Sequence, residues 1–263
     1  MPYIRIVNYH GTPLTEADLF EKQLRRYREI FVPATRADLA TLLDCEPWSH
    51  EKPGLIITFD DGLRSNFDVA APLLERYGFS GWFFIPTNFI EALPENQAAF
   101  AEHHRIVFSE MPSDRRLAMS WDEARALTRK HHVGCHTATH HRMVETTSAD
   151  QLGAEIIGSK QKLEARLGEP VDSFCWVGGE ENTYSSAAAA HVRAAGYKYG
   201  FMTNCAVVRP NTSCYQLQRT NIEAGWSLEV VDFQLSGLLD LVYWPKRTRV
   251  NRLTRGLPAG PGN

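Results

Sequence analysis

Short apolar runs typical of β-strands alternate with helical patterns along most of the chain, and this alternation constrains the fold more than any other feature. The predicted strands are residues 4–9, 54–59, 81–85, 133–136 and 173–177, and a further apolar segment follows at 197–202. Helical periodicity fills most of the intervals and ends at glycines such as Gly78 and Gly168. Because strand–helix alternation is typical of a mostly parallel sheet with helices outside it, the sequence predicts an α/β protein.

The length and composition favour a single domain. Of the 263 residues, 43% are hydrophobic and 22% are charged, which is the balance of a globular protein with a sizeable core. Single α/β barrels reach this size. We expect one domain over residues 1–250, followed by a disordered Gly/Pro-rich tail at 251–263.

Charge, cysteine usage and hydropathy limit the partners and the compartment. The net charge is -3, from 28 Lys plus Arg and 31 Asp plus Glu, so nucleic acid is not an expected partner. The five cysteines form no CxxC pair, which fits a reducing compartment. The first ten residues lack the apolar segment of a signal peptide, and no apolar run of about 18 residues could span a bilayer. We therefore expect a cytoplasmic protein with no membrane span.

Two adjacent carboxylates, Asp60 and Asp61, follow the predicted strand 54–59 directly. Side chains at the carboxyl ends of parallel strands form the active sites of α/β proteins. Adjacent side chains at a strand end can point in different directions, so one carboxylate could bind a metal while the other acts as a base. Asp-Asp-Gly is also a common sequence in turns, and the acidic pair alone does not distinguish a functional site from a turn.

A histidine pair, His136 and His140, follows the predicted strand 133–136. A separation of four places two imidazoles on one side of a helical turn, close enough to share a divalent ion. Two histidines and one carboxylate leave coordination positions open for water and substrate, as in catalytic zinc sites. A histidine-rich surface turn is the alternative.

Taken in order, these motifs resemble the polysaccharide deacetylases of the NodB-homology type, carbohydrate esterase family 4. The resemblance rests on Thr58-Phe59-Asp60-Asp61-Gly62, on the strand 82–86 after the next helix, and on the approach from Trp121 to His140. It implies a distorted (β/α) barrel with seven or eight strands. It also implies a divalent metal, most often zinc, with nickel, cobalt or manganese as other possibilities.

The resemblance also implies roles for individual residues. Asp61, His136 and His140 would hold the metal, and Asp60 would be the general base. The activity implied is hydrolysis of an N-acetyl or O-acetyl group of a carbohydrate. The expected partner is therefore an acetylated carbohydrate or amino sugar.

The third and last motifs of the family are altered in this chain. The stretch 174–182 lacks the usual arginine that orients the base, and Arg219 is the candidate replacement, although an ordinary surface arginine would look the same. No histidine follows His191, so the usual general acid is missing. His10, at the end of the first predicted strand, is the candidate substitute, with His141 as a weaker one.

The same stretch supplies the candidate sugar contacts, Trp176 and Gly179, since indole rings pack on the apolar faces of sugars. The altered motifs keep two other functions open. One is a carbohydrate-binding relative that no longer catalyses the reaction. The other is a deacylase of a small amide or an amino-sugar conjugate, which a cytoplasmic location would favour.

Overall fold

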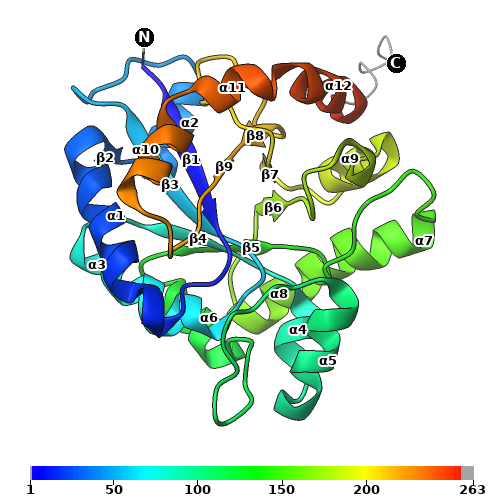
Figure 1. Ribbon diagram of the computed structural model, residues 1–263. Helices are drawn as coiled ribbons and strands as arrows, with labels where there is room; N and C mark the ends of the chain where they lie inside the picture. The colour runs from blue at the N-terminus through cyan, green and yellow to red at the C-terminus, as the bar shows by residue number, and fades with distance from the viewer. Residues whose placement is uncertain (1, 256–263) are drawn as a thin grey trace, which may run out of the picture.

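A parallel β-sheet forms the centre of the molecule in the computed structural model, which describes residues 2–255 (Figure 1). Within these residues the sheet order is β8-β7-β6-β5-β4-β3-β1-β9, and β2 pairs with β3. The strands are β1 (Ile4–Tyr9), β2 (Val32–Pro33), β3 (Gly54–Phe59), β4 (Gly81–Ile85), β5 (His132–Cys135), β6 (Ser173–Cys175), β7 (Tyr199–Met202), β8 (Leu217–Gln218) and β9 (Thr220–Asn221). The pairing between these strands is parallel throughout.

The two ends of the sheet meet at Arg219. This residue alone separates β8, which pairs with β7, from β9, which pairs with β1. Its backbone N–H donates to the carbonyl of Met202 in β7, and the backbone N–H of Ile222, three residues later, donates to the carbonyl of Asn8 in β1. The sheet therefore closes nearly completely into a distorted (β/α) barrel, as the family resemblance implies.

Helices surround the barrel and cover the outward side chains of the strands (Figure 1). The α-helices are α1 (Ala17–Ile30), α2 (Arg36–Leu43), α3 (Ala71–Arg76), α4 (Thr87–Glu91), α5 (Pro94–His104), α6 (Trp121–Leu127), α7 (Ala149–Leu152), α8 (Ser159–Leu167), α9 (Ser186–Ala194), α10 (Leu228–Leu235), α11 (Leu238–Val242) and α12 (Trp244–Thr254). Short 3-10 turns form η1 (Leu14–Glu16) and η4 (Glu181–Thr183), and π-helical segments form η2 (Asn66–Ala70) and η3 (Gly153–Gly158).

Local sequence explains where several helices begin. Ser120, Ser148 and Ser185 each accept a hydrogen bond from the backbone N–H three residues later. At α6 the Glu123 carboxylate also accepts from the N–H of Ser120, which completes a capping box.

The structure extends the sequence-based picture in two places. The segment 90–118 contains α5 and a loop that reaches the carboxyl ends of the strands. The C-terminal part forms α10, α11 and α12, which the pattern did not reveal. Because α12 continues to Thr254, the prediction that the disordered tail begins at 251 is wrong for residues 251–254. The remainder of that tail, 256–263, lies outside the described residues.

Among the described helices, none is both long and apolar enough to cross a bilayer.

Candidate active site

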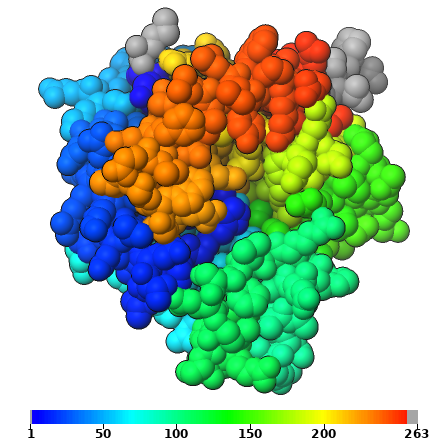
Figure 2. All heavy atoms as spheres, viewed as in Figure 1, coloured from blue at the N-terminus to red at the C-terminus, as the bar shows by residue number. Residues whose placement is uncertain are grey.

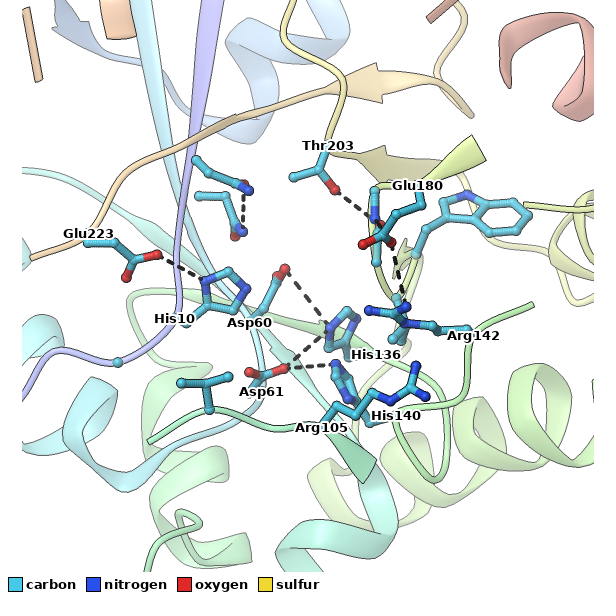
Figure 3. Close-up of a pocket in the computed structure, with 18 of the residues that line it drawn as sticks. His10, Asp60, Asp61, Arg105, His136, His140, Arg142, Glu180, Thr203 and Glu223 are labelled. Atoms are coloured by element: carbon cyan, nitrogen blue, oxygen red, sulfur yellow. Dashed lines mark hydrogen bonds and ion pairs between the residues drawn. The ribbon is translucent and has the colours of Figure 1, made fainter. Parts of the chain in front are cut away.

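A cavity of about 690 Å³ opens at the carboxyl ends of the strands, in the hollow visible at the centre of Figure 2. Most of the predicted site residues line it, namely His10, Asp60, Asp61, His136, His140, Trp176 and Gly179. Arg219 lies beneath the cavity and is fully buried. The structure therefore brings together residues from five different loops and strands, as Figure 3 shows for the polar side chains.

The acidic pair is placed by the end of β3. Both carboxylates are buried, and Asp61 adopts a left-handed backbone conformation with φ 71°. Left-handed backbone is uncommon for residues other than glycine and concentrates at functional sites, where surrounding structure holds it in place. The turn at Asp61 and Gly62 separates the two side chains, so that Asp60 faces Arg219 and Asp61 faces the histidines.

The histidine pair is placed by the loop after β5. The expected helical turn is wrong, because residues 136–140 form a loop in which Thr137 and His140 have φ of 67° and 57°. This loop nevertheless places the two imidazole rings with centroids 5.0 Å apart. The backbone N–H groups of Ala138 and Thr139 donate to Glu155 from η3, which fixes the loop between the two histidines.

Three potential ligand atoms converge at this point. The Oδ1 atom of Asp61 lies 3.5 Å from Nε2 of His136 and 3.2 Å from Nε2 of His140. In a tetrahedral site with metal–ligand bonds of about 2.1 Å, neighbouring ligand atoms are about 3.4 Å apart. The spacing of the three atoms therefore fits a divalent cation of the size of zinc.

The hydrogen bonds of the imidazoles support the same assignment. Nδ1 of His136 contacts the carbonyl oxygen of Cys175 at 3.0 Å, and Nδ1 of His140 contacts that of His104 at 2.7 Å. A carbonyl can only accept, so each Nδ1 carries the hydrogen, and in the neutral ring Nε2 presents a lone pair. Asp61 Oδ1 is buried and has no hydrogen-bond partner within residues 2–255. Three lone pairs thus face one another, an arrangement that a bound cation would satisfy.

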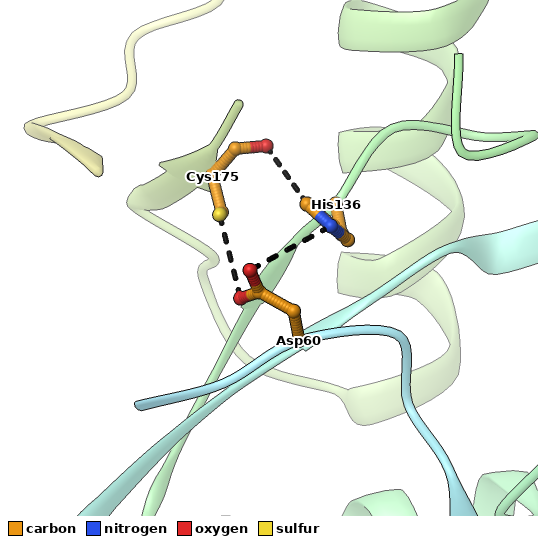
Figure 4. A group of neighbouring side chains, drawn as sticks. All are labelled: Asp60, His136 and Cys175. Carbon is orange, nitrogen blue, oxygen red and sulfur yellow. Dashed lines mark hydrogen bonds and ion pairs between the residues drawn. The ribbon is translucent and has the colours of Figure 1, made fainter. Parts of the chain in front are cut away.

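A second group of potential ligands, Asp60, His136 and Cys175, lies beside the first (Figure 4). Its thiol and carboxylate are already engaged by a cation, since Nη2 of Arg219 lies 2.9 Å from the Cys175 sulfur and 2.8 Å from Asp60 Oδ2. Burial raises the pKa of the Cys175 thiol well above its usual value. A neutral thiol next to a guanidinium is a poor metal ligand, so the Asp61 group is the better candidate.

Arg219 holds Asp60 through two parallel hydrogen bonds of 2.7 and 2.8 Å. Its guanidinium also donates to Asn8 on β1, Thr58 on β3 and the Met202 carbonyl on β7, so its position is fixed from three strands. Burial raises the pKa of Asp60, but the charges of Arg219 and His136 outweigh it and lower that pKa overall. Asp60 is therefore ionised at neutral pH and can accept a proton.

His10 lies on the opposite wall of the cavity from Glu180, and its Nδ1 is 3.7 Å from Glu223 Oε1 (Figure 3). Burial lowers the pKa of His10, but its interaction with Glu223 and the charges of Asp61 and Asp60 outweigh burial and raise that pKa to about 9. A protonated imidazole thus faces the same cavity as the carboxylates. Sequence reasoning missed Glu223, which follows a predicted site residue by four positions but belongs to no motif.

The two predicted sugar contacts are placed differently. Gly179 lines the cavity in the loop after β6, and Trp176 lines it with only 2% of its surface exposed. The Trp176 ring is instead packed between Phe174 and Tyr184, so it offers little surface for stacking. Trp226 is half-buried and also lines the cavity, which makes it the better aromatic contact. The other polar lining residues that the sequence did not indicate include Arg105, Arg142, Glu180 and Lys246.

The chain belongs to the polysaccharide deacetylase family, whose match spans residues 49–200, more than half of its length. Members of this family are hydrolases that act on amide and acetyl groups, and this assignment extends to the present chain. The matched region contains Asp60, Asp61, His136 and His140, whereas His10 and Arg219 lie outside it.

Solved structures share the fold at low sequence identity. A Streptococcus pyogenes deacetylase in complex with acetate is 20% identical, with a TM-score of 0.69, over 89% of this chain and 99% of that one. IcaB from Ammonifex degensii is 17% identical, with a TM-score of 0.67, over 84% and 92% of the two chains. A de-N-acetylase from Aggregatibacter actinomycetemcomitans is 13% identical, with a TM-score of 0.69, over 88% and 99%. No curated protein matches the sequence.

Proposed function

We propose that this protein is a metal-dependent deacetylase that hydrolyses the N-acetyl group of an amino sugar, with an O-acetyl group as the second possible target. The observation that carries the proposal is the convergence of Asp61, His136 and His140 beside the ionised Asp60. The solved relatives described as deacetylases support it, because they share the barrel over most of their length.

The metal that we propose is zinc, held by Asp61, His136 and His140. When bound, such a cation lowers the pKa of a water molecule and polarises the acetyl carbonyl. Nickel, cobalt and manganese are alternatives for the same three ligands.

The remaining steps belong to residues of the chain. Asp60 accepts a proton from the attacking water while Arg219 keeps its carboxylate oriented toward the cavity. A carbon–oxygen bond forms and the carbon–nitrogen bond of the acetamide breaks. His10 donates a proton to the departing nitrogen, so the products are acetate and a free amine.

A binding protein without catalysis is the second candidate, suggested by the altered third and last motifs. Its distinguishing feature would be a cavity without a general acid. His10 lines the cavity and has a raised pKa, which supports the enzyme.

The test is to load the purified protein with zinc and measure acetate release from N-acetylated sugars of one to six units. We expect turnover in the wild type and a loss of at least about 100-fold in Asp60→Asn. Nickel, cobalt and manganese should be compared with zinc in the same assay. Full activity of a metal-free Asp61→Ala variant would overturn the proposal.

A further inference from the structure

A second cavity, of about 550 Å³, adjoins the active-site cavity. The two share Gly11, Pro13 and Ser109 in their walls. Its size lies within the range of small-molecule sites, and its wall is predominantly apolar, as is usual for such sites. The apolar side chains that line it are Pro13, Leu14, Leu63, Val69, Phe108, Pro112 and Leu117.

The apolar residues form both a floor and a rim. Leu63 and Leu117 are buried beneath the cavity, and Phe108 is half-buried above the same cluster. Leu14 is 75% exposed and Val107, which lines the first cavity, is 74% exposed. Isolated exposed aliphatic side chains are common. Here, however, Leu14 and Phe108 line the same cavity.

Each charged residue that lines this cavity has a hydrogen-bond partner. Arg64 binds Asp68 at 2.8 Å and Asp114 at 2.6 Å. Thr15 donates to the Glu110 carboxylate at 2.5 Å. An apolar group that entered the cavity would therefore not leave one of these charges without a partner, a cost that would otherwise oppose its binding.

The connection between the cavities lies on the side of the proposed general acid. His10 is followed directly by the shared residue Gly11, then by the shared Pro13 and the rim residue Leu14. The group that His10 protonates is the departing nitrogen, which stays on the sugar. The second cavity therefore adjoins the part of the active-site cavity where the proposed function places the amine-bearing sugar.

We propose that the second cavity binds an apolar alkyl or aryl substituent of the amino sugar, so that the natural substrate is an amino-sugar conjugate. This inference rests on the proposed deacetylase function. It assigns the substrate class by the chemistry of Leu14 and Phe108, which fits hydrocarbon better than a hydrated sugar unit.

The experiment compares methyl, butyl and hexyl glycosides of N-acetylglucosamine with the unsubstituted disaccharide, using the zinc-loaded enzyme. Burial of each additional methylene should raise kcat/KM by up to about fourfold. Leu14→Ser and Phe108→Ser should flatten this dependence on chain length. Leu241→Ser is the matched control, because Leu241 is 73% exposed and lines neither cavity.

The outcomes separate this inference from the proposed function. Equal kcat/KM values for all glycosides, together with acetate release, would overturn the inference and leave the deacetylase intact. A preference for the disaccharide over the hexyl glycoside would show that the cavity is a sugar site. If no substrate is turned over, calorimetry with methyl and hexyl glucosaminide still tests the apolar site. Tighter binding of the hexyl compound that is lost in Leu14→Ser supports the site. Equal binding of the two compounds contradicts it.

Discussion

Arg219 and Asp60 form a buried pair joined by two parallel hydrogen bonds, 159 residues apart in the sequence. Arg219 is also the residue at which the barrel closes, between β8 and β9. The group that orients the proposed base is therefore part of the closing strand. Because the guanidinium contacts β1 and β3 as well, closure of the barrel and assembly of the site depend on the same side chain.

Arg219→Met should leave the Asp60 carboxylate buried without its partner. Removing one member of a buried ion pair costs about 3–5 kcal/mol, so the free energy of unfolding should fall by that amount. Arg219→Lys keeps the positive charge but loses the two parallel hydrogen bonds to Asp60. It should reduce kcat at least about tenfold, with a smaller loss of stability than Arg219→Met. Urea unfolding and acetate release measure the two effects. Arg249→Lys, at an exposed ion pair with Glu181, is the control and should change neither.

Asp61→Asn should abolish the stabilisation that zinc gives to the folded protein. Zinc at 1,000 times its dissociation constant stabilises a protein by about 4 kcal/mol, so the wild type should melt at a higher temperature with zinc than after chelation. The variant should show no such difference, and metal analysis should find it empty. Asp122→Asn, 87% exposed at its side chain, should behave as the wild type. A zinc-dependent melting shift in Asp61→Asn would show that the metal binds elsewhere.

The residues proposed to bind the metal could be predicted from the sequence because the acidic motif and the histidine motif each begin directly after a strand. β3 ends one residue before Asp60, and β5 ends one residue before His136. The distance between these strand ends follows from parallel pairing through β4. Local sequence and sheet topology therefore determine this part of the site.

The rest of the site depends on long-range contacts that no motif encodes. Glu223 reaches His10 only because β9 pairs with β1, and β9 is too short to give a strand pattern. The burial of the Trp176 ring could not be predicted for a related reason: it depends on packing against Tyr184, from a loop whose path cannot be read from composition. The helices α10 to α12 were missed because their apolar residues do not follow one clear face, and several remain exposed.

Gly134→Ala should weaken both the fold and the metal site. Gly134 lies in β5, two residues before His136, and an added Cβ would approach the Phe84 ring to 2.5 Å and Ser173 Oγ to 2.6 Å. Overpacking of this kind costs about 1–3 kcal/mol, and displacement of β5 should also lower zinc affinity. Gly153→Ala is the matched control: nothing lies within 4 Å of its Cβ, so its stability should be equal or slightly higher. Equal stability and zinc affinity in both variants would contradict the prediction.

The pH dependence of activity should report the pair of His10 and Glu223. A general acid works only while protonated, so kcat/KM should fall as the pH rises through the pKa of His10, which is about 9 in the absence of metal. A bound cation beside Asp61 offsets the carboxylate charges, and the fall should then begin at a lower pH. Glu223→Gln removes the nearest negative charge, lowers the pKa of His10, and should move the fall to lower pH still. His10→Gln should lower kcat/KM at every pH, without moving the pH at which kcat/KM falls.

Stability should depend on the same pair with a defined sign. The folded-state pKa of His10 is raised above its ordinary value of 6.5, so the folded protein binds the proton more tightly than the unfolded chain. The stabilisation is complete below pH 6.5 and disappears as the pH rises through about 9. Urea unfolding of the metal-free protein between these limits should show this loss in the wild type and a smaller one in Glu223→Gln. NMR titration of the His10 ring measures the pKa directly, and an unshifted value in the wild type would refute the role assigned to Glu223.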